Sequence, residues 1–291
     1  MKKLSFIRRT SERYWVGDGF PVRNLFSYDD DDPTALSPFV HLDYAGPEEF
    51  PPTEKRRGVG PHPHRGIETV TIVYSGEVEH RDSGGGCGTI GPGDVQWMTA
   101  ASGIVHEELH GSSYAKRGGP FEMIQLWVNL AAKDKKAPPG YQTVKHSQIP
   151  RVALPSGAGT VRVIAGNYQG TQGPAHTYSP MNVWDVRLTR GAVVEFHIRS
   201  GWTAALFVLK GGVRLESGEV AGEAELAVFQ REGETFEVEA LDDSTILFLS
   251  GEPIDEPIVG EGPFVMNTKA EIQQAIDDYR AGRMGHLAEH A

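Results

Sequence analysis

The sequence predicts an all-β protein in two similar halves, with one short helix near the C-terminal end. Three observations lead to this prediction. Short runs rich in β-branched residues alternate with glycine-containing turns, a pattern typical of β-sandwiches and barrels. The second half of the 291-residue chain repeats the first in outline. A single stretch with helical spacing follows Thr268.

Composition and charge narrow the class of protein. At 39% hydrophobic residues the chain can bury a sizeable core. The net charge of −11 repels phosphate backbones, so we expect no direct binding to nucleic acid. Charged residues between Arg8 and Arg13 interrupt any secretion signal, and no apolar run is long enough to span a membrane. The single cysteine, Cys87, cannot form an internal disulfide, which favours the cytoplasm and an ordinary loop thiol.

The N-terminal segment, residues 1–32, mixes aromatic residues with glycine and proline and is expected to form short strands and loops. The acidic run Asp29–Asp32 lacks the spaced ligands of a calcium loop, so we expect a solvated turn there. Residues 39–44 alternate apolar and polar side chains as a strand does. His41 and Asp43 on this strand either line a pocket or form a hydrogen-bonded pair, and we favour the pair.

Further strands follow at short intervals. Proline fixes φ and glycine supplies positive φ at the tight turn of residues 90–94, and other turns contain serine with glycine. None of the runs between these turns has a helical period. The predicted strands are residues 69–74, 77–81, 95–98, 104–109 and 121–129.

Two paired motifs suggest a metal site. Side chains two residues apart on a strand share a face, so His62 and His64 point the same way, as do His106 and Glu108. A single histidine pair is more often a surface feature, but two pairs on predicted strands are hard to explain in that way. Brought together, three imidazoles and one carboxylate suit a divalent first-row transition metal. Neutral imidazoles and one carboxylate would leave coordination positions open for a substrate or O₂.

Glu68 is the hardest acidic residue to place. It lies four residues after His64, where a regular strand would put it on the same face as the histidines. Gly66 lies between them and can break the register. We therefore expect Glu68 to orient a ligand or to serve the structure, and not to bind the metal.

The domain boundary is predicted at residues 133–140, a charged and proline-rich linker, with one domain at 1–132 and the other at 141–291. In the repeat, residues 207–213 resemble 72–78, and 232–240 resemble 92–100.

The histidines are not repeated, because residues 246–249 take the place of the His106 strand. We therefore expect the second half to be metal-free, with His176 and His197 as ordinary loop or strand residues.

One helix is expected near the end. Thr268 and Glu271 have the spacing of a capping box, and apolar residues recur at helical spacing after them. The tail carries His286 and His290 four residues apart, as in some metal sites. Because it has few apolar anchors, we expect a frayed end instead.

The segments HPHRGIETVT, GEVEHRDS, GTIGPGDVQWMTA and GIVHEE, with GEPIDEPIVGEGPFVMNT near the end, closely resemble the pirins, a branch of the cupin superfamily. The resemblance implies a bicupin, that is, two tandem antiparallel β-barrels of the jelly-roll type, with one non-haem iron in the first. It implies as ligands the same four residues, His62, His64, His106 and Glu108. General cupins carry a histidine soon after the turn where this chain has Gln96, a departure that agrees with pirins.

The resemblance also implies two functions. Our first choice is a dioxygenase that opens flavonols such as quercetin with O₂, with Glu108 as general base. The alternative is an iron-dependent, redox-sensing regulator that binds partner proteins. Fe(II) is the expected metal, and Mn, Ni, Co and Zn are also compatible. The residues expected either to line an aromatic pocket or to fill the barrel core are Trp97, Met98, Phe121, Met123 and Trp127.

Overall fold

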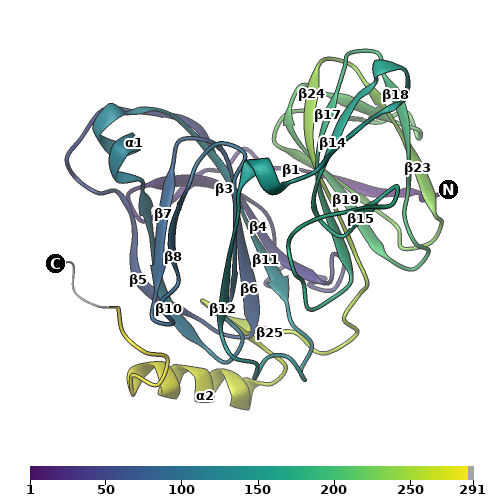
Figure 1. The fold of residues 1–291 in the computed structure, drawn as a ribbon. Coiled ribbons are helices and arrows are strands. Elements are labelled where there is room, and N and C mark those ends of the chain that lie inside the picture. Colours follow the sequence, from purple (N-terminus) through teal and green to yellow (C-terminus); the bar gives the residue numbers. More distant parts are fainter. Residues whose placement is uncertain (288–291) are drawn as a thin grey trace. The chain divides into compact units, whose positions relative to one another are not determined.

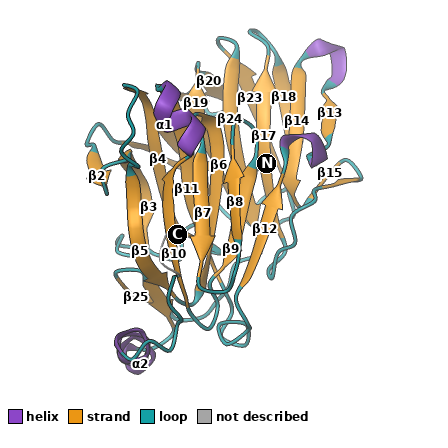
Figure 2. Ribbon diagram, turned by 60° about the vertical axis from the view of Figure 1, so that its left-hand side comes forward, coloured by secondary structure: helices purple, strands orange, loops and turns teal. Residues whose placement is uncertain are grey.

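The computed structural model describes residues 1–287, which form two antiparallel β-barrels (Figures 1 and 2). Each barrel combines a seven-stranded sheet with a four-stranded sheet. The all-β prediction, with two barrels and a short C-terminal helix, is confirmed. The first-barrel unit comprises Glu12–Thr34, Phe39–His146 and the described residues from Ile254 onward, and the second-barrel unit comprises Met1–Ser11, Ala35–Pro38 and Ser147–Pro253.

The first-barrel unit contains the predicted metal motifs. Its seven-stranded sheet has the order β12-β9-β6-β11-β4-β3-β2, and its four-stranded sheet has the order β5-β10-β7-β8. The elements are β2 (Tyr14–Val16), β3 (Phe20–Ser27), β4 (Phe39–Phe50), β5 (Gly58–His64), β6 (Ile67–Ser75), β7 (Val78–Asp82), β8 (Cys87–Ile90), β9 (Val95–Thr99), β10 (Ile104–His110), α1 (Ser112–Arg117), β11 (Gly119–Asn129), β12 (Gly140–Val144), β25 (Val259–Glu261), β26 (Phe264–Met266) and α2 (Lys269–Arg280).

The second-barrel unit repeats this plan. Its sheets have the orders β1-β22-β19-β24-β17-β14-β13 and β18-β23-β20-β21. The strands are β1 (Leu4–Arg9), β13 (Arg151–Ala153), β14 (Gly159–Ala165), β15 (Asn167–Tyr168), β16 (Thr171–Gln172), β17 (Met181–Leu188), β18 (Val193–His197), β19 (Thr203–Lys210), β20 (Val213–Leu215), β21 (Val220–Ala221), β22 (Glu225–Phe229), β23 (Thr235–Ala240) and β24 (Ser244–Gly251).

Several segments join a different unit from the one that the boundary at 133–140 predicts. Strand β1 pairs with β22 in the second barrel, and β12 pairs with β9 in the first. Residues 254–287, with helix α2, belong to the first-barrel unit. The physical reason is edge protection, because β9 and β22 would otherwise present unpaired backbone groups. Strand pairing of this kind depends on partners far apart in sequence.

The predicted linker is anchored inside the first-barrel unit. Lys135 is only 2% exposed. Its Nζ donates hydrogen bonds of 2.8, 2.6 and 2.8 Å to the oxygens Gly66 O, Asn129 Oδ1 and Val265 O. Burial lowers the pKa of Lys135 to about 7. The lysine thus connects the turn after β5 to the C-terminal segment.

Helix α2 begins as predicted. Thr268 caps it, because its Oγ1 accepts a hydrogen bond from the backbone N–H of Glu271 at 3.2 Å. The helix buries Ile272 and Ala275 in a cluster that includes Val105 of β10. Figure 1 shows α2, in yellow, at the end of the barrel near β10 and β25. The predicted histidine pair in the tail is only partly described, because His290 lies outside the described residues.

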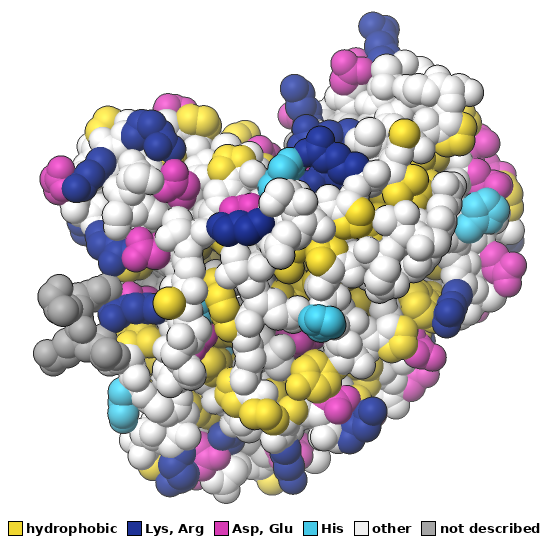
Figure 3. Space-filling view, viewed as in Figure 1, with side chains coloured by type: hydrophobic (Ala, Val, Ile, Leu, Met, Phe, Trp, Pro, Cys, Tyr) yellow, Lys and Arg dark blue, Asp and Glu magenta, His cyan; other side chains and the backbone are white. Residues whose placement is uncertain are grey.

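Helix α1, only six residues long, was not predicted. The acidic run Asp29–Asp32 lies in a turn after β3. His41 and Asp43 form the predicted pair, with Nε2 of His41 3.0 Å from Oδ2 of Asp43. Among the described residues, no helix is both long and apolar enough to cross a membrane. On the face shown in Figure 3, acidic and basic side chains are interspersed in small groups.

The inner face of the first barrel carries a row of polar side chains. Cross-strand neighbours on β9, β6, β11, β4 and β3 form this row, which we call the polar row. Its members are Gln96, Thr71, Gln125, Asp43 and Asn24. A buried polar side chain is costly unless it has a hydrogen-bond partner. The polar row therefore indicates that this face of the barrel serves a role other than apolar packing.

The second barrel is filled with apolar side chains instead. By sheet order, β18 corresponds to β5 and β23 to β10. The predicted repeat is right for residues 207–213, because β19 corresponds to β6, but it is wrong by one strand after that. Residues 232–240 include β23, which corresponds to β10 and not to β9, and β24, which contains residues 246–249, corresponds to β11. Phe196 of β18 faces Phe236 of β23, and their rings stack with centroids 5.4 Å apart. Two phenylalanines thus occupy strands that carry histidines in the first barrel.

Candidate metal centre

Strands β5 and β10 bring the three predicted histidines together. The two strands pair in antiparallel fashion, with His106 opposite His62 and Ile104 opposite His64. Ring centroids are 4.3 Å apart for His62 and His106, 5.0 Å for His64 and His106, and 5.1 Å for His62 and His64. One ring nitrogen of each histidine lies within 4.8 Å of those of the other two. The alternation of side chains along a strand therefore places the histidines as expected.

An unpaired atom shows that this cluster suits a metal. Nε2 of His106 is buried and has no hydrogen-bond partner among the described residues. Buried polar atoms in folded proteins nearly always have a partner, so an exception requires an explanation. A divalent transition metal provides one, because imidazole nitrogen is among its preferred ligands.

Backbone carbonyls orient the other two rings. Nδ1 of His62 lies 2.8 Å from the carbonyl oxygen of Gly60, and Nδ1 of His64 lies 3.1 Å from that of Pro263. A carbonyl oxygen can only accept, so Nδ1 carries the hydrogen in both rings. Each Nε2 then keeps its lone pair, which is the form that binds a metal.

Burial also favours the uncharged forms of His64 and His106. It lowers the pKa of His64 and of His106 well below the ordinary value, and the neighbouring His62 lowers both further. Neutral imidazoles are therefore favoured at neutral pH. Metal binding at such a pH would not need to remove protons from these two rings.

Glu108 lies beside the cluster and is held across the barrel. One of its carboxylate oxygens lies within 4.8 Å of a ring nitrogen of His106 and of one of His80, but the group of three histidines does not include Glu108. Oε1 accepts hydrogen bonds from Thr71 Oγ1 at 2.9 Å and Gln96 Nε2 at 3.0 Å. Oε2 accepts one from Gln125 Nε2 at 2.7 Å. Three members of the polar row thus bind one carboxylate.

Trp127 forms a wall beside the histidines. Its ring centroid lies 5.0 Å from that of His64 and 4.6 Å from that of His41. Tyr28 stacks on Trp127, with ring centroids 6.3 Å apart. Of the other predicted pocket residues, Trp97 and Met98 are buried, and Phe121 and Met123 lie in a hydrophobic cluster with Phe20.

Glu68 faces away from Glu108. It lies three residues from Thr71 on β6, so the two side chains lie on opposite faces of the strand. Gly66 has a φ of 83°, and a Cβ there would lie 2.0 Å from the carbonyl oxygen of Val265. This glycine therefore breaks the register between His64 and Glu68. Glu68 instead accepts a hydrogen bond from Thr99 Oγ1 at 2.7 Å.

Sequence reasoning missed several neighbours of the cluster. His80 and Asp82 lie two residues apart on β7, and both are buried close to His106. Their spacing equals that of His106 and Glu108, so the same rule of alternation could have identified them. Pro263 could not be found in this way, because it lies 199 residues after His64.

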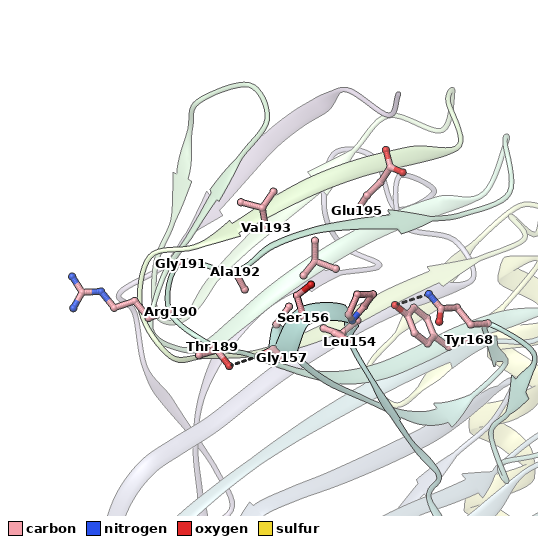
Figure 4. Close-up of a pocket in the computed structure, with 14 residues that line it drawn as sticks. Leu154, Ser156, Gly157, Tyr168, Thr189, Arg190, Gly191, Ala192, Val193 and Glu195 are labelled. Atoms are coloured by element: carbon pink, nitrogen blue, oxygen red, sulfur yellow. Dashed lines mark hydrogen bonds between the residues drawn. The ribbon is translucent and has the colours of Figure 1, made fainter.

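The second barrel offers no comparable group among the described residues, since both clusters of potential metal ligands lie in the first. It has a pocket of about 660 Å³, whose lining residues include Ser156 and Thr189 and, from strand β18, Glu195. Figure 4 shows Arg190 pointing away from this pocket and Thr189 bonded to the backbone of Gly157. The pocket therefore presents no cluster of groups suited to chemistry.

Comparison with known proteins agrees with these observations. The family model described as Pirin matches residues 19–128, and the model described as the pirin C-terminal cupin domain matches residues 183–285. A protein of Pseudomonas aeruginosa named "Putative quercetin 2,3-dioxygenase" is 56% identical over 283 residues, 97% of this chain and 98% of that protein. The human protein named Pirin is 38% identical over 234 residues, 78% of each chain.

A solved structure shares the whole fold. The crystal structure of quercetin 2,3-dioxygenase from Acinetobacter baumannii has a TM-score of 0.96 to this chain. The two are 49% identical, and the match covers 99% of this chain and 100% of the other. The similarity therefore extends over both barrels and the C-terminal helix.

Proposed function

Because the chain belongs to the pirin family of bicupins, we propose that it is a metal-dependent dioxygenase that opens flavonols such as quercetin with O₂. The observation that carries this proposal is the buried, unpaired Nε2 of His106 between His62 and His64. The names of the relatives from Pseudomonas and Acinetobacter support the choice of substrate class.

The proposed ligands are the Nε2 atoms of His62, His64 and His106, together with a carboxylate oxygen of Glu108. Fe(II) is the first choice of metal, and Mn, Ni, Co and Zn also accept imidazole and carboxylate ligands. When bound, the metal would supply open coordination positions for adjacent hydroxyl and ketone oxygens and the capacity to exchange electrons with O₂.

Glu108 is proposed to take the proton of the substrate hydroxyl. Oε1 would first have to lose a hydrogen bond, because it already accepts two. Thr71 allows this, since its Oγ1 also lies 3.0 Å from Oε1 of Gln125. Rotation of the Thr71 hydroxyl toward Gln125 would leave Oε1 free to receive the proton, while Gln125 Nε2 still holds Oε2.

The aromatic wall is proposed to hold the flat substrate. Trp127 offers a ring beside His64, and His41 extends this surface. His41 is itself fixed by Asp43, which also accepts hydrogen bonds from Tyr14 and Asn24. Flat rings placed against such a wall are held by stacking and by exclusion of water.

Oxygen uptake tests the proposal. The purified protein, loaded with Fe(II), should consume O₂ with quercetin and should not do so with a flavone that lacks the adjacent hydroxyl group. The control separates chelation by two oxygens from general binding of flat molecules. If the loaded protein consumes no O₂ with any flavonol, the dioxygenase proposal fails.

A second candidate is an iron-dependent regulator that binds a partner protein. One observation favours it, namely that His62 is partly exposed while His64 and His106 are buried. The cluster therefore reaches the surface, where a change in oxidation state could alter a docking site. A comparison of partner capture by the ferrous and ferric forms tests this candidate.

A further inference from the structure

A chain of hydrogen bonds runs from the turn after β7 to His106. The backbone N–H groups of Gly84 and Gly86 donate to Oδ1 of Asp82 at 2.8 and 2.9 Å. Oδ2 of Asp82 lies 3.0 Å from Nε2 of His80. Nδ1 of His80 lies 3.3 Å from Nδ1 of His106. The side chains of Asp82, His80 and His106 are all buried, so water does not compete for these contacts.

Two independent neighbours define the protonation of His80. The carboxylate of Asp82 accepts, so Nε2 of His80 carries the hydrogen. On the other side, Gln96 Nε2 lies 3.2 Å from Nδ1 of His80 and can only donate. Exchanging the oxygen and nitrogen of the Gln96 amide would break two hydrogen bonds. Nε2 also donates to Glu108, and Oε1 accepts from the Tyr141 hydroxyl at 3.3 Å. Nδ1 of His80 is therefore an acceptor.

It follows that Nδ1 of His106 is a donor and that its Nε2 holds a lone pair. We infer that Asp82 and His80 are positioning residues, which fix the tautomer and ring orientation of His106 so that Nε2 is available to a metal. This inference rests on the proposed metal site. The side chain of His80 would thus orient His106 in the way that the backbone carbonyls of Gly60 and Pro263 orient His62 and His64.

The same chain explains a second cluster of potential ligands. Ligand atoms of His80, His106 and Glu108 also lie within 4.8 Å of one another. In this cluster, however, Nδ1 of His80 and Nδ1 of His106 face each other, Nδ1 of His80 also faces the amide of Gln96, and Nε2 of His80 faces Asp82. Tyr141 also stacks on His80, with centroids 4.6 Å apart and planes 13° apart. The cluster is therefore a closed support for one metal site and not a second site.

Asp82→Asn is the sharpest test, because the two glycine N–H groups determine how an asparagine would lie. They would bind its amide oxygen and turn its NH₂ group toward Nε2 of His80. His80 would then accept at Nε2 and donate from Nδ1, and His106 would have to carry its hydrogen on Nε2. We expect the affinity for Fe(II), or for Zn(II) as a redox-inert probe, to fall about 10- to 100-fold in a chelator competition assay.

The tautomer can also be read directly in the metal-free wild type, which needs no variant. Nitrogen-15 correlation spectra of the imidazole rings should show His106 protonated at Nδ1, and in folded Asp82→Asn they should show it protonated at Nε2. Protonation at Nε2 in the wild type overturns the inference. So does an unchanged metal affinity in an Asp82→Asn protein whose circular dichroism matches the wild type.

Asp43→Asn is the matched control. Asp43 faces Nε2 of His41 at the same 3.0 Å, but His41 touches Trp127 and not a proposed ligand nitrogen. Metal affinity should survive this change, and an equal loss in both variants would mean general damage to the barrel and overturn the inference. A wild type that shows the expected tautomer but binds no metal would instead defeat the proposed function alone.

Discussion

Gln125 donates a hydrogen bond from Nε2 to Oε2 of Glu108 over 2.7 Å. The two residues lie on different sheets, since β11 belongs to the seven-stranded sheet and β10 to the four-stranded one. The contact therefore spans the inside of the first barrel, and Thr71 and Gln96 reinforce it. A carboxylate held in this way has a defined position before any ligand arrives, which reduces the cost of ordering it later.

Glu108→Gln should lower turnover by about 10²- to 10⁴-fold per bound metal, since it removes the proposed base and keeps its size. The amide group would also face donors from the polar row, so part of the metal should be lost. Turnover is therefore divided by metal content measured on the same sample. Thr71→Val, which removes only the donor that can switch partners, should have a smaller effect. Unchanged turnover per metal in Glu108→Gln would refute the role of base.

His106→Ala should abolish stoichiometric metal binding, because it removes the ligand atom that is buried without a partner. His62→Ala should do the same. The control is a double substitution of His176 and His197 in the second barrel, which should leave metal content at the wild-type level. Elemental analysis after purification gives the answer. Metal retained by His106→Ala, or lost from the control, would contradict the proposed ligand set.

Removal of the metal should reduce hydrogen-exchange protection unevenly. Protection should fall in β5 and β10, which carry the proposed ligands, because binding free energy stabilises the segments that hold the ion. It should also fall around Pro263, whose carbonyl orients His64. Strands β18 and β23 of the second barrel should change little. An equal loss of protection in both barrels would count against this distribution.

Glu68 should make stability depend on pH. Burial raises its pKa to about 7, although the hydrogen bond from Thr99 opposes the shift. Between its unfolded value of 4.5 and about 7, the folded chain keeps a proton that the unfolded chain releases. The free energy of unfolding therefore falls as the pH rises through this range, by about 3 kcal/mol.

Glu68→Gln should remove this dependence, because an amide cannot ionise. Urea unfolding of both proteins at about pH 5 and about pH 8 measures the difference in slope. Turnover per bound metal should change little, since Glu68 and Thr71 lie on opposite faces of β6. The explanation is wrong if the two proteins lose stability in parallel between these pH values.

The local rules predicted much of this structure. Alternation along a strand placed His62 and His64 on one face, and likewise His106 and Glu108, and the capping box at Thr268 located the start of α2. These features depend on residues a few positions apart. The role of Gly66 was anticipated for the same reason, because its effect on the strand is local.

The rest could not be predicted from local patterns. The pairing of β1 with β22 and the contact of Pro263 with His64 join segments about 200 residues apart. Lys135 was predicted to lie in a charged and proline-rich linker, because the sequence does not show the three oxygens that accept hydrogen bonds from it. The support from Asp82 and His80 requires knowledge of which strand lies beside β10.

The contact between His64 and Pro263 has a consequence for the order of events during synthesis. His64 leaves the ribosome 199 residues before Pro263 does. Until the C-terminal segment arrives, no carbonyl fixes the hydrogen of His64 on Nδ1, and either ring nitrogen can carry it. At the proposed site, a nascent chain that already contains β5 and β10 would therefore bind metal weakly. If the proposed site holds a metal, we expect it to be acquired late, by chains whose translation and folding are nearly complete.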